Sequence, residues 1–225
     1  RRAIRSAALA AALALRAGEA LGQSQIGTTY HGGTYTQDFN TLVDNGNGDL
    51  MWSNNSTLPG WYALNTFTQS APQTIFPSDG AGTTGGLFSF GAESDPERAL
   101  GSLADGHYAG YFGICLTNNT GESINQITIR YTGEEWRETT APANTLGFSY
   151  AVGAVSLSAG SYTNANSLNF VAPSAGTSVE VDGPVDGNDG AYQTALMATI
   201  TLDSAWTPGA ALWLRWSDVN DPGNN

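Results

Sequence analysis

Hydrophobic residues recur at every second position over short stretches along most of this chain. In the stretch QITIRYTG, Ile127, Ile129 and Tyr131 alternate with Thr128 and Arg130. Successive side chains of a β-strand point to opposite faces of the sheet. The spacing therefore predicts a strand with one face buried and the other exposed.

The same period of two predicts further strands and their inward faces. The expected inward residues are Leu146, Phe148 and Tyr150 in TLGFSYAVG, Leu196, Ala198, Ile200 and Leu202 in ALMATITLD, and Leu212, Leu214 and Trp216 in ALWLRWSD. Further candidate strands are LFSFGA, YAGYFGICLTN and SLNFVAP. No stretch after residue 22 sustains the period of 3.6 that indicates an amphipathic helix.

Short strands separated by Gly, Asn, Pro and Asp predict an all-β fold. We expect a single domain over residues 23–225, in which two antiparallel sheets pack face to face as a jelly-roll-like β-sandwich. A barrel is the alternative. The Pro- and Gly-rich stretch 172–190 is interpreted as a long loop inserted into this domain.

The first 22 residues follow a different pattern. Arg1, Arg2 and Arg5 precede an apolar run at 7–15, and small residues follow up to Gly22. A positive end before a short apolar segment is typical of a secretory signal peptide, and this one is too short to span a bilayer. Residues 1–22 therefore predict a short signal helix and an exported protein, with a short amphipathic helix as the alternative. We expect no transmembrane span in the rest of the chain.

The composition limits the kinds of partner. Twenty acidic and eight basic residues give a net charge of −12, and the chain contains no lysine. A strongly negative surface repels phosphate backbones, so we expect no nucleic-acid partner.

The one cysteine, Cys115, cannot form an internal disulfide. Because it lies in the apolar stretch YFGICL, it is predicted to be buried as a small hydrophobic residue.

Two acidic residues stand side by side in the motif GEEWRE. Glycoside hydrolysis needs two carboxyl groups that face each other across a sugar. Adjacent strand residues point apart, so Glu134 and Glu135 form a poor catalytic pair. We expect instead that one carboxylate contacts Arg130 or Arg137, with Trp136 packed at the sheet edge. The sequence contains no nucleophile elbow, phosphate loop or zinc-ligand spacing, so no catalytic residues are assigned.

The carboxyl-terminal stretch DVNDPGNN favours a calcium ion. Asp218, Asn220 and Asp221 gather hard oxygen donors on a turn, and these are the ligands that Ca²⁺ prefers. Asp and Asn are also common in turns because they satisfy nearby backbone groups. We expect no required cofactor, with Ca²⁺ at these three residues as the candidate ion.

Aromatic residues provide the candidate ligand-binding surface. Trp213 and Trp216 point to opposite faces of one predicted strand, so Trp213 is expected outside the core between the sheets unless an insertion covers it. An exposed ring on a β-sandwich can stack against a sugar. Trp136, Arg137 and Trp213 are therefore the predicted ligand-binding residues.

Several motifs in order along residues 34–225 resemble a family of bacterial exported β-sandwich domains. They are YTQDFNTL, NNSTLPGWYA, RALGSL, YFGICLTNNTG, ITIRYTGEEWR and LWLRWSDVNDPGNN. Members of this family include PEP-CTERM sorting-domain proteins and hypothetical surface proteins, and the LPGW motif is also similar to galactose-binding-like jelly rolls. The resemblance implies a surface location and a further strand after NDPGNN, so that 23–225 would stop before the last strand.

These observations predict a secreted or cell-surface, non-catalytic module of a bacterium, with a glycan or an extracellular matrix polymer as its partner. The alternative is an extracellular hydrolase that acts on polysaccharides, or an accessory domain of one. Its acids would come from Glu93, Asp95, Glu134 and Glu135. The arrangement of these acids discriminates between the two functions, because a hydrolase needs two of them in one groove.

Overall fold

A computed structural model of the 225-residue chain describes residues 2–11, 27–42, 48–138, 145–174 and 182–219. The described fold is all-β, as the alternating pattern predicts. Its elements in chain order are β1 (Arg2–Ala11), β2 (Thr28–Tyr30), β3 (Gly33–Gln37), β4 (Leu50–Met51), β5 (Trp61–Asn65), β6 (Thr74–Ser78), β7 (Gly86–Phe90), β8 (Ala99–Leu103), β9 (Gly110–Asn118), β10 (Ile124–Glu135), β11 (Arg137–Glu138), β12 (Thr145–Val152), β13 (Thr163–Asn164), the 3-10 turn η1 (Asn166–Leu168), β14 (Phe170–Val171), β15 (Gly183–Pro184), the 3-10 turn η2 (Gly190–Tyr192), β16 (Gln193–Trp206) and β17 (Ala211–Asp218).

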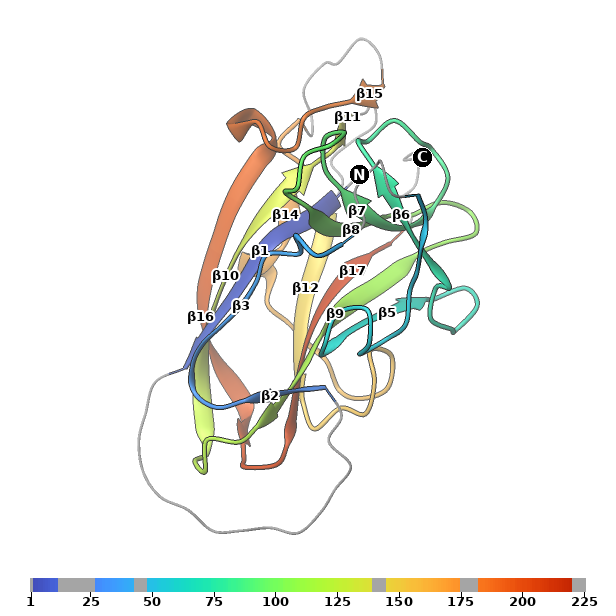
Figure 1. Ribbon diagram of the computed structural model, residues 1–225. Coiled ribbons are helices and arrows are strands. Elements are labelled where there is room, and N and C mark those ends of the chain that lie inside the picture. Colours follow the sequence, from blue (N-terminus) through green and yellow to red (C-terminus); the bar gives the residue numbers. More distant parts are fainter. Residues whose placement is uncertain (1, 12–26, 43–47, 139–144, 175–181, 220–225) are drawn as a thin grey trace.

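The strands form two large sheets and one small one. The eight-stranded sheet has the order β16-β10-β1-β8-β7-β6-β4, with β3 beside β1. The seven-stranded sheet has the order β13-β12-β17-β9-β2, with β14 beside β12 and β5 beside β9. Strands β11 and β15 pair with each other at one end of the molecule (Figure 1).

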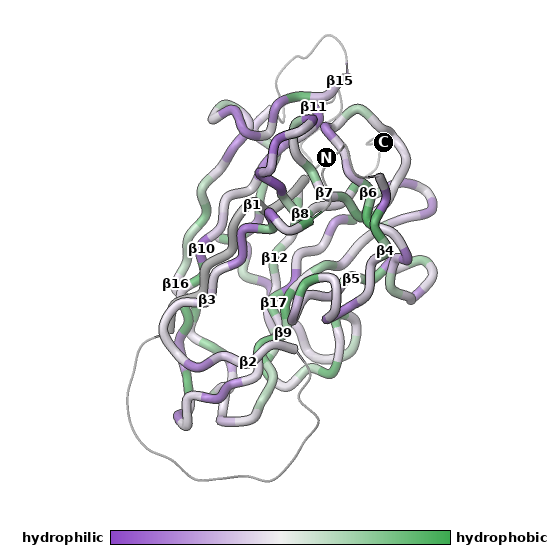
Figure 2. The backbone as a smooth tube through the Cα atoms, in the orientation of Figure 1, coloured by the Kyte–Doolittle hydropathy of each residue, from purple (hydrophilic) through white to green (hydrophobic). Residues whose placement is uncertain are grey.

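Residues from both large sheets form one main hydrophobic core. Ile127 and Ile129 of β10 belong to it together with Phe148 of β12 and Leu214 of β17. All the inward positions predicted for β10, β12 and β17 are buried there, and those predicted for β16 are buried or packed against it. Figure 2 shows hydrophobic and hydrophilic residues interspersed along β10 and β16, the pattern from which these faces were predicted.

Two strand pairs are parallel, whereas the sequence predicted antiparallel sheets throughout. These pairs are β2 with β9 and β6 with β7. Strands β6 and β7 have five residues each and are about 17 Å long. The connection at 79–85 can reach about 23 Å. It is therefore long enough to return along β6, so that β7 starts at the same end as its neighbour.

The N-terminal segment is a strand over residues 2–11, where the sequence predicted a helix. Strand β1 pairs with β10 on one side and with β8 and β3 on the other. Pairing on both sides satisfies the backbone N–H and C=O groups, and this tertiary gain outweighs the helix propensity of alanine. Residues 12–22 of the predicted signal helix lie outside the described residues.

Each large sheet also carries a smaller hydrophobic cluster on its outer face. The first outer cluster contains Phe88, Phe90, Ala99, Leu103 and Trp136. The second outer cluster contains Cys115, Ala151, Ala154, Leu157 and Trp213. Cys115 is fully buried, as predicted, and burial raises the pKa of its thiol to about 12.

Candidate functional site

A pocket of about 540 Å³ opens at the end of the eight-stranded sheet, where β6 and β7 run in parallel. We call it the Phe76 pocket. Its lining residues are Phe76, Pro77 and Ser78 of β6, Asp79, Gly82, Thr84 and Gly85 of the connection, Phe88 of β7 and Glu93 of the next loop. Small-molecule sites have volumes of roughly 300–1,000 Å³. The pocket is therefore large enough for a small ligand such as a sugar.

Aromatic rings form the inner wall of the pocket. Ile75 and Leu87 point into the main core, so Phe76 and Phe88 point to the outer face. Their ring centroids are 5.9 Å apart. Phe76 is 37% exposed and Phe88 only 7%, so Phe76 offers the accessible ring surface.

The aromatic row continues from the pocket into the first outer cluster. Phe88 stacks on Phe90 with 5.2 Å between ring centroids, and Phe90 stacks on Trp136 at 6.2 Å. Aromatic pairs at such distances add stability beyond the area they bury. This row holds the wall rigid, because its deeper members are fixed by packing.

The connection that forms one rim depends on a glycine. Gly80 has a φ of 98°, and a Cβ at this position would lie 1.7 Å from the backbone oxygen of Trp136. Only glycine fits such a close approach with a left-handed backbone. The Asp79 carboxylate accepts a hydrogen bond of 2.9 Å from the N–H of Ala81, which tightens the same turn.

The other end of the connection is anchored by Asp105. Its carboxylate accepts hydrogen bonds from the backbone N–H groups of Gly85, His107 and Tyr108, at 2.7, 2.7 and 2.8 Å. Burial alone would raise the pKa of Asp105, but these three donors together with nearby His107 hold it below its ordinary value. The ionised carboxylate thus joins the β8–β9 turn to the lining residue Gly85.

A fully buried arginine organises the loop that carries Glu93. The Arg98 guanidinium donates to the backbone oxygens of Ala92 and Asp95, both at 3.2 Å. It also donates to the backbone oxygen and the hydroxyl of Ser89, at 3.1 and 3.2 Å. Five N–H donors in a fixed plane suit this task. The loop on either side of Glu93 is held from below by Arg98.

The chemistry of the lining is that of a binding surface for a polar ring. Phe76 can stack against an apolar face, while Asp79, Glu93 and Thr84 can accept or donate hydrogen bonds at its edge. Among the described residues that line the pocket there is no arginine or histidine. The charged side chains of this lining are therefore the carboxylates of Asp79 and Glu93.

The tryptophans predicted as ligand-binding residues are both buried. Trp136 and Trp213 are each 1% exposed. Trp136 lies in the first outer cluster, and Gly187 covers its ring so closely that a Cβ there would lie 2.4 Å from it. Trp213 is covered by Ala154 and Leu157, and its Nε1 donates to the Ala154 backbone oxygen at 2.9 Å. Neither ring offers a face on which a sugar could stack, because segments distant in sequence cover both.

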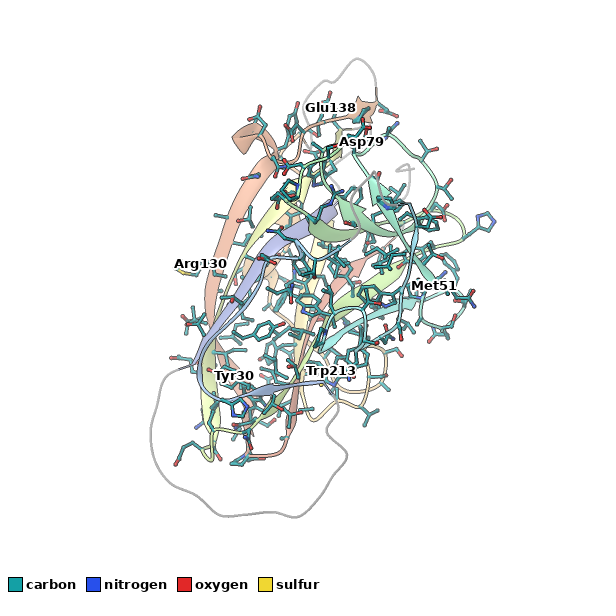
Figure 3. The ribbon with its side chains drawn as sticks, viewed as in Figure 1. Tyr30, Met51, Asp79, Arg130, Glu138 and Trp213 are labelled. Atoms are coloured by element: carbon teal, nitrogen blue, oxygen red, sulfur yellow. The ribbon has the colours of Figure 1, made fainter. Side chains whose placement is uncertain are left out.

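Arg137 lies beside the pocket rather than in its lining. Its Nη1 is 3.4 Å from the backbone oxygens of Gly80 and Ala81, on the rim connection. Figure 3 shows Asp79, in the same turn, close to Glu138 at the top of the molecule. The structure thus brings Arg137 near the Phe76 pocket but separates it from Trp213.

The adjacent glutamates are buried and contact different groups. Glu134 accepts a hydrogen bond of 2.9 Å from Trp136 Nε1. Glu135 accepts one of 2.9 Å from the Ser174 N–H and a second from the Ser174 hydroxyl. Because Trp136 belongs to the first outer cluster, the Glu134 side chain lies on the outer face of β10. Their hydrogen bonds therefore stabilise local structure, and Glu93 alone of the acids considered for a hydrolase lines the pocket.

Asp218, predicted to bind calcium, is buried at the end of β17. It accepts a hydrogen bond of 2.7 Å from the hydroxyl of Ser102, which lies on β8 of the eight-stranded sheet. Burial and the nearby Asp218 carboxylate both raise the pKa of Tyr108. Asn220 and Asp221 lie outside the described residues. Within the described ranges, no group of three His, Cys, Asp or Glu side chains is arranged to hold a metal ion.

The pattern of the chain contains a partial signal for this pocket. In TIFPS and LFSF, aromatic residues take the positions that alternate with the core residues, where exposed strand faces usually carry polar ones. That placement marks the outer face of β6 and β7 as unusual. The parallel pairing and the return of the connection over this face could not be inferred from it.

Comparisons with known proteins identify no relative. No family model, no curated protein and no solved structure matches this chain. In the part of the chain that the structure covers, no helix has the length and apolar character needed to cross a bilayer. The function is therefore argued from the pocket itself.

Proposed function

We propose that this chain is an exported, non-catalytic β-sandwich module of the jelly-roll type that binds carbohydrate in the Phe76 pocket. The sandwich assignment is supported by the main core, which contains residues of both large sheets. Two sheets that share one core through their inner faces are the defining feature of that architecture.

The observation that carries the binding role is that the accessible ring of Phe76 and several polar groups line one pocket. Asp79, Thr84 and Glu93 all line the same pocket and are exposed. Sugars present an apolar face of C–H groups and an edge of hydroxyls, so they need both a flat ring and hydrogen-bonding partners. The pocket combines these two requirements.

The experiment is a calorimetric titration of the full chain with a panel of oligosaccharides. We expect binding by at least one of them, and a roughly tenfold loss of affinity in Phe76→Ala, since losing one stacked ring costs about 1–2 kcal/mol. The matched control is Phe67→Ala, because Phe67 is also exposed (57%) but does not line the pocket. Absence of binding across the panel, or equal losses in the two variants, would refute the proposal.

A polysaccharide hydrolase is the second candidate, because two carboxylates line one pocket. Asp79 and Glu93 come from different loops and both face the same space. Glycosidases use two acids placed on either side of the scissile bond. Chromatography of labelled oligosaccharides after incubation distinguishes the two functions. Shorter products that disappear in Glu93→Gln would establish the hydrolase, and intact substrates would favour the binding module.

Export and surface location complete the proposal. They are supported by the pattern of Arg1, Arg2 and Arg5 before an apolar run, and by the resemblance to bacterial surface domains. The expected partner is a glycan of the cell surface or of an extracellular matrix. Expression with a tagged C-terminus in a bacterial host, followed by fractionation, tests this part: retention of the full-length chain in the cytoplasm would contradict it.

Calcium at Asp218, Asn220 and Asp221 stays part of the proposal as a structural ion. The support is the oxygen-rich composition of this stretch. A ligand that binds only the folded state raises its melting temperature. We expect a higher melting temperature in millimolar Ca²⁺ than in a chelator, and identical curves would remove calcium from the proposal.

A further inference from the structure

Two exposed carboxylates line the Phe76 pocket. Asp79 lies on the rim connection and Glu93 on the loop after β7, so negative groups from two separate segments face one space. The whole chain carries a net charge of −12, which adds a negative background at neutral pH. A cationic group would lower the free energy of this arrangement.

Among the described side chains, those of Arg98 and Arg137 lie near the pocket without lining it. The Arg98 guanidinium is buried and directed to the backbone oxygens of Ala92, Asp95, Ser89 and Gly91. The Arg137 guanidinium is directed to the backbone oxygens of Gly80 and Ala81. Both hold loop backbones, and neither belongs to the lining. Among the described residues that line the pocket, the two carboxylates are therefore the charged groups that a ligand would meet.

An aromatic ring that lines the same pocket as the carboxylates suits the same kind of ligand. The face of a phenyl ring attracts a cation placed within about 6 Å of its centre. Phe76 is the exposed member of the aromatic row, and Phe88 lies directly beside it. An ammonium group bound between the rings and the carboxylates would gain from both.

We propose that the Phe76 pocket selects protonated amino sugars over neutral sugars, an inference that rests on the proposed carbohydrate-binding function. The sugar ring stacks on Phe76 while its ammonium group contacts Asp79 or Glu93. An N-acetylated sugar keeps the ring and its hydroxyls but loses the charge, so it keeps the stacking and the hydrogen bonds and lacks the ion pair.

The test compares the trimer of glucosamine with the trimer of N-acetylglucosamine by calorimetry, at about pH 6, where amines are protonated and carboxylates are ionised. The glucosamine trimer should bind roughly tenfold more tightly at low salt, since a cation–π contact and an exposed ion pair each contribute modestly. The preference should shrink as salt is added, because exposed charges are screened.

Variants separate charge from stacking. The double variant Asp79→Asn/Glu93→Gln should bind the two trimers equally, because its amides can still exchange hydrogen bonds with sugar hydroxyls but no longer attract the ammonium group. Phe76→Ala should weaken both. The control is Asp203→Asn, an exposed acid on β16 at the other end of the sheet, which should keep the preference.

The outcomes distinguish this inference from the function on which it rests. Equal affinity for the two trimers in the wild type, both lost in Phe76→Ala, would overturn the charge selection and keep the carbohydrate-binding role. A preference that persists in the double variant, or that is lost in Asp203→Asn, would show that general charge attraction and not the pocket is responsible. Absence of binding by any sugar would overturn both.

Discussion

The two ends of the eight-stranded sheet have similar inner faces and very different outer faces. At β10 and β16, Thr128 contacts Thr199 through their hydroxyls at 2.8 Å, and Arg130 lies against the Met197 sulfur at 3.2 Å. Figure 3 shows Arg130 projecting from this edge into solvent. These outer side chains form cross-strand pairs on the surface, of the kind found on any exposed sheet.

At β6 and β7 the outer positions carry aromatic residues instead. Phe88 and Phe90 there are buried in the first outer cluster together with Trp136, whereas Phe76 beside them is 37% exposed. The pocket forms where this outer cluster ends, because the ring of Phe76 is not covered. The comparison teaches that the composition of the outer face, rather than that of the core, decides where this sheet forms a pocket.

The largest expected effect comes from breaking the aromatic row at its buried centre. Phe90→Ala should lower the free energy of unfolding by about 3–5 kcal/mol, because Phe90 is fully buried between Phe88 and Trp136. Urea denaturation measures the change. The counterpart at the other end, Thr128→Ala, should cost less than about 1 kcal/mol. Equal losses would mean that the two outer faces do not differ in their contribution to stability.

The next largest effect on stability is expected from Arg98, which is buried near the pocket, and it is compared with the exposed Arg130 at the other end of the sheet. Arg98→Met should destabilise the protein by about 3 kcal/mol, because it leaves several backbone oxygens of the Glu93 loop without their donor. Arg130→Met should stay within about 0.5 kcal/mol, as for most exposed positions. Denaturation of both variants under the same conditions is the measurement. A stable Arg98→Met variant would contradict the role given to this side chain.

Truncating the exposed ring should change stability little. Phe76→Ala removes a side chain that is 37% exposed, so we expect a loss of about 1 kcal/mol or less. Met197→Ala, at the other end, should behave similarly. Thermal unfolding checks both. A large loss in Phe76→Ala would indicate that this residue belongs to the packed cluster, and the sugar titration of that variant would then need a milder substitution such as Phe76→Leu.

The smallest effect is a pH dependence at the pocket end. The pKa of Asp105 is lowered by folding, so its stabilising contribution is present above the ordinary value of 3.8 and is lost as the pH falls through the lower folded value. Asp105→Asn should remove this part of the acid sensitivity. Urea midpoints from neutral pH down to about pH 3 measure it. An unchanged acid profile in the variant would exclude this contribution.

Alternation along the chain determined the inner faces, because burial of every second side chain is a local property of a strand. The inward positions of β10, β12, β16 and β17 and the burial of Cys115 were predicted on that basis and are confirmed. The opposite orientations of Trp213 and Trp216 were also predicted, since they occupy positions of different parity on one strand.

Only the tertiary structure decided what covers the outer faces. Loops that are distant in sequence bury Trp136 and Trp213, so two rings predicted to be accessible are not. The connection at 79–85 returns along β6, pairs β6 with β7 in parallel and, with the loop held by Arg98, creates the Phe76 pocket. The sequence by itself determines which side of a strand is apolar. Which segments meet on that side depends on contacts between residues far apart along the chain, and local periodicity carries no information about them.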